Sequence, residues 1–420
     1  MKKKMRLAMI SFHTSPLAPL GKGKAGGMNA YVLAMGREFA GRGIEVDCFT
    51  RIQDPDTATA VQNGPGMRVI SLAAGPAVPL PPPALISYLP EFRAGAAAFQ
   101  EREGRAYDLL HAHYYLSGWA GLRLKQSWRI PLLFMFHTIG PLKDAVAREG
   151  EDREPLFRRQ IEEEVSNGAD LIIASNPHER DSIRGLYRVA EEKVAVLPCG
   201  VDTTLFRPSD QREARARLGL PPGKILLFVG RMEAVKGIDL LWQAMARLRS
   251  AADLPSGFFP KLILIGGEGS GDRWRAQATQ LGLDPFVLFL GAQPHREMPL
   301  YYAACDALVM PSRYESFGIV ALEAAACGRP VIATSVGGLP YAVSEDRTAL
   351  LVPGNDVEAL ASAIQRILSD EGLANSLGQE GRRWAETFSW SNISGRMLSI
   401  YERALAMPAT GGKGADAESG

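Results

Sequence analysis

The protein has 420 residues, of which 46% are hydrophobic and 22% are charged, and its formal net charge is +1. This length exceeds what one ordinary hydrophobic core needs, so two domains are expected, and the composition is that of a soluble globular chain. The near-neutral balance excludes the bulk electrostatic attraction used by nucleic-acid-binding and membrane-surface proteins. Any anion site must therefore arise from the local placement of cations.

Cysteine usage and the N-terminus indicate the compartment. The four cysteines are far apart and form no CxxC pair, which predicts a reducing environment and no thiolate metal site. The basic residues at 1–6 precede only a short apolar run without a cleavage site, so they introduce a first buried strand rather than a signal peptide. No stretch reaches the roughly 18 to 20 apolar residues of a membrane span. We therefore expect a cytoplasmic protein without integral membrane association.

Short apolar runs alternate with longer helix-like segments along the whole chain. Strands are predicted at 7–12, 45–50, 68–72, 109–113, 132–137, 171–175, 194–197, 225–229, 262–265, 287–290, 307–311, 331–334 and 349–352. Strands separated by helices form parallel βαβ units with both sheet faces covered. The predicted fold class is therefore α/β, with two doubly wound, Rossmann-like domains that bind ligands at the carboxyl ends of their strands.

The domain boundary is predicted near 199–208, where a strand runs into turn residues and a new helix follows at 211–218. The N-terminal domain then covers 1–200 and the C-terminal domain 201–388. The end of the chain, 407–420, is rich in Gly, Ala and Ser and is predicted to be a disordered tail.

Glycines open the first helix of the first domain, in the segment 26–32. They allow a close backbone approach to a phosphate, and the helix directs its positive end toward it. The segment 21–26 also reads GxGxxG, with Glu45 and Asp47 roughly 20 residues later, as in nicotinamide-dependent oxidoreductases. That alternative needs the pattern to follow its strand directly, whereas 13–20, with two prolines, intervenes here.

Histidines end two predicted strands of the first domain. They lie in the segments 111–118, which reads HAHYYLSG, and 136–138, which reads FHT. A single histidine at a strand end is more often packed than functional. Three of them (His111, His113 and His137) near one predicted cleft indicate a functional site.

Two cations follow the first strand of the second domain, in the segment Gly230-Arg-Met-Glu-Ala-Val-Lys-Gly237. Arg231 leaves the strand end, and Lys236 stands at the entry to the next helix. Both can reach a ligand in a cleft between the domains, where two cations would neutralise a diphosphate.

Two glutamates frame a helix start about 80 residues later, in the same domain. Glu315 stands at the mouth of the predicted helix and Glu323 lies inside it, while 316–318 supply backbone N–H groups that attract anions. Gly328 and Pro330 end the helix. A phosphate held at this helix start would leave the two carboxylates facing opposite ends of one ligand.

Together these segments resemble the retaining nucleotide-sugar glycosyltransferases of the GT-B fold, family 4, along nearly the whole chain. The matching parts are the Gly26-Gly27 loop, Gly200-Val-Asp202, Arg231 with Lys236, the spaced glutamates, and Phe388-Ser-Trp390. The resemblance implies two Rossmann-like domains that face each other across a cleft. It also implies that a final helix, about 389–406, crosses back onto the first domain.

The resemblance also assigns donor roles. Arg231 and Lys236 would hold the diphosphate, and Gly27 would approach the departing phosphate. Glu323 would bind the ribose hydroxyls, and Glu315 would contact the transferred sugar. Further contacts would come from the backbone of Phe317, Gly318 and Ile319.

A closer resemblance, carried by GGMN, HxHYYLSG and FHT, is to the subgroup with the mycothiol-pathway inositol-phosphate N-acetylglucosaminyltransferase and the sucrose-phosphate synthases. It implies that His137 contacts the donor sugar, and that the acceptor pocket is lined by Asn29, Tyr114, Thr138 and Arg158. The mycothiol enzyme has an acceptor-phosphate lysine in the loop corresponding to 76–83, but this sequence has no lysine between Lys24 and Lys125. Arg158 can still bind a phosphate through two bonds.

The implied activity is that of a retaining α-glycosyltransferase. It would move a hexose or N-acetylhexosamine from a UDP-sugar to a small polar acceptor such as inositol phosphate or a hexose phosphate. No cofactor and no metal are expected, because cations and helix termini offset the diphosphate charge, and Asp54-Pro-Asp56 is remote from the donor motifs. The alternative is a membrane-surface lipid or polysaccharide glycosyltransferase, which the balanced charge of 88–103 disfavours. A homodimer remains open.

Overall fold

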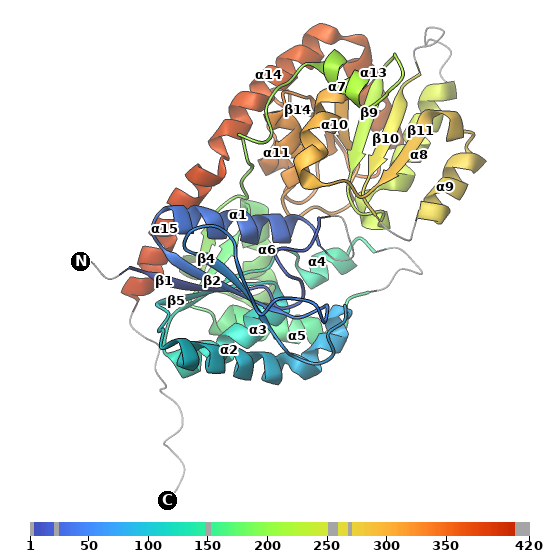
Figure 1. Ribbon diagram of the computed structural model, residues 1–420. Coiled ribbons are helices and arrows are strands. Elements are labelled where there is room, and N and C mark those ends of the chain that lie inside the picture. The colour runs from blue at the N-terminus through green and yellow to red at the C-terminus, as the bar shows by residue number, and fades with distance from the viewer. Residues whose placement is uncertain (1–3, 21–24, 148–152, 251–258, 268–270, 408–420) are drawn as a thin grey trace, which may run out of the picture.

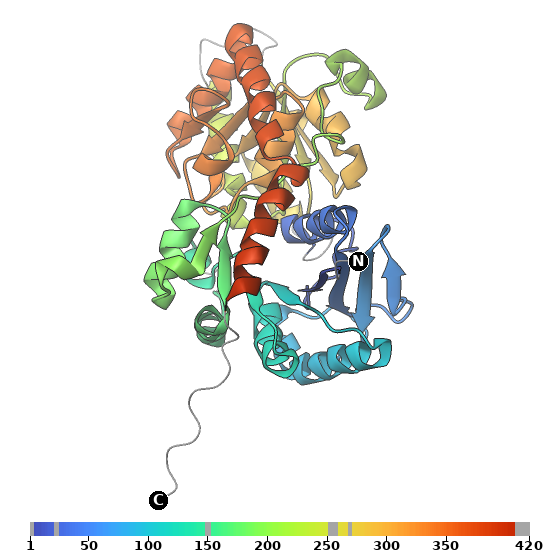
Figure 2. The same cartoon turned by 90° about the vertical axis from the view of Figure 1, so that its left-hand side faces the viewer.

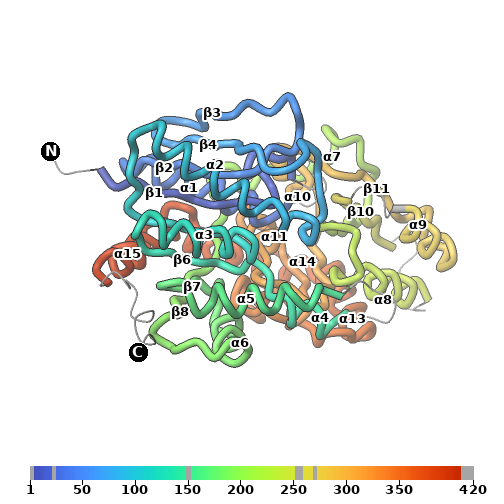
Figure 3. Tube along the Cα trace, turned by 90° about the horizontal axis from the view of Figure 1, so that it is seen from below, coloured from blue at the N-terminus to red at the C-terminus, as the bar shows by residue number. Residues whose placement is uncertain are grey.

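Two sheets, one in each half of the chain, organise the computed structural model, which describes residues 4–20, 25–147, 153–250, 259–267 and 271–407 (Figure 1). The first sheet has eight strands in the order β3-β4-β2-β1-β5-β6-β7-β8. Figure 3 labels the strands of this sheet except β5, from β3 at one edge to β8 at the other. The strands are β1 Arg6–Ile10, β2 Glu45–Arg51, β3 Ala60–Gln62, β4 Met67–Leu72, β5 Leu109–His113, β6 Leu132–Met135, β7 Leu171–Ala174 and β8 Val194–Val196.

The second sheet has six strands in the order β11-β10-β9-β12-β13-β14, and all its pairs are parallel. Its strands are β9 Ile225–Val229, β10 Lys261–Ile265, β11 Val287–Gly291, β12 Ala307–Met310, β13 Val331–Thr334 and β14 Ala349–Val352. In both sheets the strand order reverses beside the first strand, β1 or β9. Loops leaving neighbouring strands in opposite directions open a crevice there, which is where such sheets bind ligands.

Helices cover both faces of each sheet. In the first half they are α1 Gly27–Gly41, α2 Leu89–Glu103, α3 Tyr115–Trp128, α4 Gly140–Asp144, α5 Leu156–Gly168 and α6 Pro177–Tyr187, with short 3-10 turns η1 Pro82–Tyr88 and η2 Glu191–Lys193. In the second they are α7 Gln211–Arg217, α8 Ile238–Ser250, α9 Gly271–Gln280, α10 Met298–Ala304, α11 Ile319–Ala326, α12 Leu339–Ala342 and α13 Val357–Ser369, with η3 Ala234–Lys236, η4 Asp284–Phe286 and η5 His295–Glu297. The chain ends with α14 Glu371–Thr387 and α15 Trp390–Ala406.

Alternation along β1 explains why both faces must be covered. Leu7 and Met9 are buried in one cluster with residues of α1 and α15, while Ala8 and Ile10 are buried in another with residues of α2 and α3. Successive strand side chains point to opposite faces, so a strand that is apolar throughout needs a helix layer on each side. The predicted α/β fold class is therefore confirmed.

The thirteen predicted strands are all present, and the structure adds β3, which the sequence analysis missed. This strand has only three residues, is half-buried or exposed, and pairs antiparallel with β4 at the sheet edge. An edge strand that buries little has no apolar run for a pattern to detect.

The chain passes twice between the sheets, and the two passages lie side by side. Val201 forms a bridge with Ser389, in which the Val201 N–H donates to the Phe388 carbonyl at 2.9 Å. Helix α14 packs on the second half of the chain, and α15 then runs on against α1 (Figure 2). The Arg42 guanidinium donates to Ser394 Oγ at 3.1 Å, and Tyr401 packs on Phe39 with ring centroids 5.1 Å apart.

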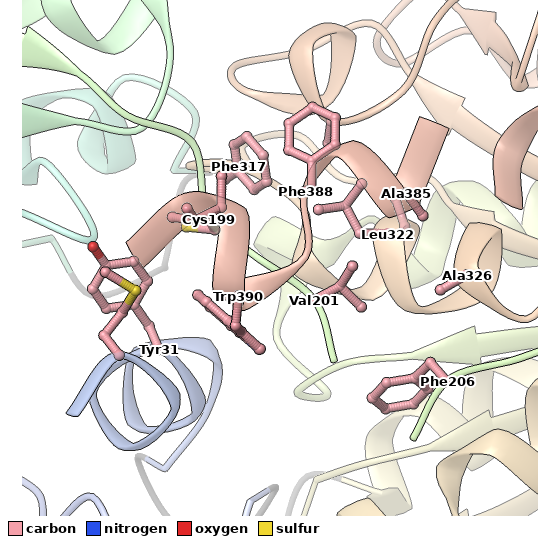
Figure 4. Packing of buried hydrophobic residues seen from close by; sticks show 14 of the residues in the cluster. Tyr31, Cys199, Val201, Phe206, Phe317, Leu322, Ala326, Ala385, Phe388 and Trp390 are labelled. Carbon is pink, nitrogen blue, oxygen red and sulfur yellow. The ribbon is translucent and has the colours of Figure 1, made fainter. Parts of the chain in front are cut away.

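Aromatic side chains fill the space around this double passage. Tyr31 of α1 meets Trp390 at a ring-centroid distance of 5.7 Å, and Phe317 meets Phe388 at 6.2 Å (Figure 4). One buried cluster therefore continues from the first sheet into the second. The boundary at residue 200 stays a prediction, and the predicted tail, 407–420, lies outside the described residues apart from Met407. None of the described helices is long and apolar enough to cross a bilayer.

Candidate active site

The segment between β12 and α11 forms the centre of the candidate site. Helix α11 begins after Gly318, whose φ of 108° lies in the left-handed region. A Cβ at this position would also lie 2.7 Å from Leu339 Cδ2, so only glycine fits. Glu315 therefore precedes a sharp turn into the helix, and Glu323 is buried on the helix itself with 6% exposure.

Lys236 and Glu315, which are 79 residues apart, meet directly. The Lys236 Nζ donates to Glu315 Oε2 at 2.6 Å, and both side chains are largely buried. The neighbouring Gly237 allows this approach, because a Cβ there would lie 1.8 Å from the Pro311 carbonyl oxygen. The structure thus brings together the loop after β9 and the loop after β12, as parallel neighbouring strands require.

Arg231 leaves the same strand end but is engaged differently. Its Nη1 donates to Glu233 Oε1 at 2.6 Å, and both side chains are about one-third exposed. Both predicted diphosphate-binding cations are therefore paired with carboxylates of their own domain. Sequence reasoning missed Glu233 as a partner, although its position two residues after Arg231 is visible in the sequence.

Glu323 is held by two side chains that the sequence analysis did not select. The Tyr302 hydroxyl donates to Glu323 Oε2 at 2.7 Å, and His295 Nε2 lies 2.8 Å from Oε1. Burial lowers the pKa of His295, but its hydrogen bond with Glu323 and the charges of Glu323 and Asp202 outweigh burial, so the pKa lies above the usual imidazole value. His295 lies in the turn η5 shortly after β11, so its place near a strand end was the signal available in the sequence.

A cavity of about 710 Å³ opens beside Glu323 and His295. Its lining also includes Ile319 at the start of α11 and residues of α1 from the first domain. A Cβ at Gly27 would lie 3.4 Å from the Ile319 side chain, so the glycine loop of the first domain faces the start of α11 across this space. Lys236 and Glu315 are not part of its lining. The cavity therefore corresponds to the Glu323 end of the site.

The three histidines at strand ends of the first domain lie together, with His111 and His113 buried and His137 half-buried. His113 Nδ1 lies 3.0 Å from His137 Nε2, and His111 Nδ1 lies 2.8 Å from the Tyr401 hydroxyl of α15. Burial, with smaller contributions from His111 and His13, lowers the pKa of His137 to about 3, and burial lowers that of His111 to about 3 as well. His137 has a positive φ of 60°, which is strained for a residue with a side chain.

Arg158 gathers two of the other predicted acceptor residues. Its Nη1 donates to the Tyr114 hydroxyl at 3.3 Å, and its Nη2 donates to Thr138 Oγ1 at 3.0 Å. Its exposure is 1%, because Glu162 and Glu154 also bind the guanidinium, at 2.8 and 2.9 Å. The two glutamates were not selected from the sequence, and their spacing of four on either side of Arg158 was the signal.

Glu154 bridges Arg158 to a second cation. Its Oε1 accepts from Lys143 Nζ of α4 at 2.6 Å, while its Oε2 meets Arg158. Burial alone would raise the pKa of Glu154, but Arg158 and Lys143 hold it below its usual value. Lys143 is thus a cation beside the predicted acceptor pocket that sequence reasoning did not identify.

Asn29 lies in a separate hydrogen-bond network. Its amide donates to Thr14 Oγ1 at 2.9 Å and to the Ser15 carbonyl at 2.7 Å, and its Oδ1 accepts from the Gly26 N–H at 2.9 Å. The side chain is buried with 1% exposure. In this structure Asn29 fixes the glycine loop at the start of α1.

The acidic residues that suggested an oxidoreductase or a metal site have structural roles in this fold. Asp47 accepts from Arg68 Nε at 2.7 Å and from the Tyr107 hydroxyl at 2.7 Å, which leaves it inside the sheet. Asp54 accepts from the N–H of Asp56 at 3.0 Å, forming a local turn. Glycines 21 and 23 lie outside the described residues. Among the described residues, no group of three or more His, Cys, Asp or Glu side chains is arranged to hold a metal ion.

Known proteins match this chain along almost its full length. The profile of Glycosyltransferase Family 4 matches residues 25–205, and that of Glycosyl transferases group 1 matches residues 210–384. D-inositol 3-phosphate glycosyltransferase from Acidothermus cellulolyticus is 39% identical over 96% of this chain and 91% of its own. The protein of that name from Corynebacterium glutamicum is 37% identical over 96% and 97%.

A solved structure agrees with these relatives. Sucrose-phosphate synthase from Thermosynechococcus elongatus is 37% identical, with a TM-score of 0.87 over 96% of this chain and 100% of its own. The chain belongs to the family 4, group 1 glycosyltransferases and is a glycosyltransferase of the GT-B fold.

Proposed function

We propose that the protein is a retaining, metal-independent α-glycosyltransferase that uses a UDP-sugar. It would transfer a hexose or N-acetylhexosamine to a small polar acceptor that carries a phosphate, such as inositol phosphate or a hexose phosphate. The observation that carries this proposal is the Lys236–Glu315 contact at 2.6 Å, at the mouth of the helix that bears Glu323. The names of the relatives, which act on inositol 3-phosphate or form sucrose phosphate, support the acceptor class.

The donor would lie along the second domain. Arg231 and Lys236 would exchange their bonds to Glu233 and Glu315 for bonds to the diphosphate, whose charge is larger than that of a carboxylate. A carboxylate has about four acceptor positions, so Glu323 can bind ribose hydroxyls while keeping its partners Tyr302 and His295. The backbone of 317–319 would then face the sugar and phosphates at the positive end of α11.

The acceptor would lie against the first domain. Its phosphate would take the place of Glu154 between Arg158 and Lys143, where a carboxylate already bridges the two cations. Tyr114 and Thr138, both bonded to Arg158, would complete the pocket. Lys143 would thereby supply the cation that the segment between Lys24 and Lys125 lacks.

Transfer would occur on the face from which the diphosphate departs. The bond from the anomeric carbon to the diphosphate oxygen breaks, the acceptor oxygen bonds to that carbon, and the acceptor proton passes to the departing phosphate. Arg231, Lys236 and the start of α11 would offset the charge that develops on the diphosphate. Glu315 is bonded to Lys236 and is not assigned as a nucleophile. His137, neutral in the fold, would contact the sugar as a hydrogen-bonding group.

A nucleotide-release assay tests this function. UDP-, GDP- and ADP-sugars are each combined with inositol phosphate, hexose phosphates and free inositol, with and without EDTA. We expect release that requires a UDP-sugar together with a phosphorylated acceptor, that EDTA leaves unchanged, and that yields an α-linked product by NMR. Turnover only with free inositol, a β-linked product, or loss of activity in EDTA would contradict the acceptor, the stereochemistry or the metal independence, respectively.

A further inference from the structure

A backbone carbonyl of the candidate donor site accepts hydrogen bonds from side chains of the first domain. Ser316 lies between Glu315 and the start of α11, and its carbonyl oxygen faces the junction of β7 and α6 in the first domain. Asn176 Nδ2 donates to this carbonyl at 2.7 Å, and Ser175 Oγ lies 3.0 Å from it. Asn176 and Ser316 are 140 residues apart and follow strands of different sheets, β7 and β12.

The amide of Asn176 can have only one orientation here. Its Oδ1 accepts from the Glu179 N–H at 2.8 Å, which caps the start of α6. Its Nδ2 donates both to Ser175 Oγ, at 2.9 Å, and to Ser316. A flipped amide would set an NH₂ group against an N–H and an oxygen against a carbonyl oxygen, so the hydrogen-bond pattern excludes it.

Of the two neighbouring donors, Asn176 rather than Ser175 supplies the hydrogen bond to the Ser316 carbonyl. The Ser175 hydroxyl has a single hydrogen, and the Glu179 carboxylate at 2.5 Å is a nearer and stronger acceptor for it than Ser316. All three side chains are buried, with 3% exposure for Ser175, 1% for Asn176 and 4% for Glu179. A buried amide that is fully bonded holds its neighbours in place, because breaking any one bond leaves a polar group unpaired.

The Ser316 carbonyl is confined from its own domain as well. A Cβ at Gly338 would lie 2.2 Å from this oxygen, so the turn that contains Gly338 packs directly on it. The Gly338 N–H also donates to the Glu315 carbonyl at 2.8 Å. The segment that carries Glu315 thus packs against the Gly338 turn of its own domain on one side and is bonded to Asn176 of the first domain on the other.

We propose that Asn176 is a positioning residue, through which the first domain sets the backbone of 315–318 when the two domains are together. The inference rests on the proposed function, since it concerns the sugar contact assigned to Glu315 and the N–H groups after it. The Asn176 bond exists only while the domains meet, so it links their closure to the geometry of the donor loop. An open molecule would bind nucleotide on the second domain alone but would hold Glu315 less firmly.

The test replaces the amide while keeping the helix cap. Asn176→Asp retains an oxygen for the Glu179 N–H but sets a second oxygen against the Ser316 carbonyl. Asn176→Ser also caps α6 and is too short to cross the cleft. We expect kcat to fall at least about 10-fold in Asn176→Asp, since a lost hydrogen bond corresponds to a factor of about 3 to 10 and repulsion adds to it. Affinity for UDP, measured by calorimetry, should change less than about 3-fold.

Controls separate positioning from simple loss of stability. Asp210→Asn is the control, because it exchanges Asp and Asn at another helix cap, that of α7. There Asp210 Oδ1 accepts from the Glu213 N–H at 2.7 Å, and the variant should keep the wild-type kcat. X-ray scattering with UDP should give a larger radius of gyration for Asn176→Asp than for the wild type. Wild-type kcat in both Asn176 variants would overturn the proposal, as would equal losses of UDP affinity and kcat with a lowered thermal midpoint. If the wild type transfers no sugar, the proposed function fails, while the scattering comparison still tests the contact.

Discussion

Individual residues of the candidate site are held by partners within the protein. Lys236, Arg231, Glu323 and Arg158 each have at least one oppositely charged or hydrogen-bonding partner within 2.9 Å. Such pairs avoid the cost of buried unpaired charge in the free protein. They also keep each side chain oriented, so that the proposed ligands would replace the carboxylates on Lys236, Arg231 and Arg158 and would add to the partners of Glu323 without reordering the site.

At this scale the sharpest expectation concerns Lys236. Replacing it with Ala removes a cation from the proposed diphosphate and leaves Glu315 unpaired. We expect kcat to fall roughly 100- to 1,000-fold, the range found when one preorganised electrostatic group is removed from an active site. Steady-state kinetics measures this effect. Lys224→Ala is the matched control, because Lys224 forms only a 3.5 Å surface pair with the exposed Glu371 and should retain full activity. Similar activity in both variants would refute the donor-site assignment.

The candidate site residues occupy similar places relative to the strands. Selected residues follow strand ends of both sheets: His113 ends β5, His137 follows β6, Arg231 follows β9 and His295 follows β11. Parallel strands bring their carboxyl ends to one edge, so residues remote in the sequence converge there. His111 is bonded to the Tyr401 hydroxyl and His113 to His137, and burial is the main cause that lowers the pKa of all three. His295 differs, because Glu323 raises its pKa.

This burial predicts a pH dependence of stability. His111 and His137 have a pKa of about 3 in the fold and about 6.5 when unfolded, so the unfolded chain binds more protons between these values. The fold should therefore lose stability as pH falls below about 6.5, by up to about 1.4 kcal/mol per pH unit for each histidine. The thermal midpoint, measured from pH 7 to pH 4, should show a shallower decline in His111→Gln than in the wild type. An unchanged slope would mean that His111 is not held neutral.

At the scale of the whole molecule, the double chain passage joins the domains. Gly200 and Trp390 face each other there, and a Cβ at Gly200 would lie 2.4 Å from Trp390 Cε3. The same indole packs on Tyr31, which in turn packs on the His137 ring with centroids 5.3 Å apart. The double passage is therefore connected to His137 of the candidate site through Tyr31. A change in the packing around Trp390 should affect both the domain connection and the position of His137.

Gly200→Ala tests this packing. The added methyl group must displace the Trp390 ring, so we expect a loss of about 1 to 3 kcal/mol in the free energy of unfolding, as for other overpacked cores. Chemical denaturation followed by circular dichroism measures it. Gly185→Ala provides the contrast, because nothing lies within 4 Å of a Cβ at this position in α6, and alanine should stabilise the helix by about 0.5 to 1 kcal/mol. Equal effects of the two substitutions would show that the passage is not tightly packed.

The sequence by itself determined the fold class, the family resemblance and thirteen of the fourteen strands found in the described residues. Buried parallel strands are apolar along their length, and sharp turns into helices need glycine, so both leave local patterns. Lys236, Glu315 and Glu323 were selected because they stand next to such patterns, whereas the pocket with Arg158 was predicted from the family resemblance.

Only the tertiary structure decided which partners these residues have. His295 and Tyr302 hold Glu323, Lys143 reaches Arg158 through Glu154, and Asn176 crosses the cleft to Ser316. None of these groups stands out in the sequence, since a single polar side chain leaves no periodic signal. Their contacts arise from the way the strand edges and the two domains meet, which is a property of long-range packing.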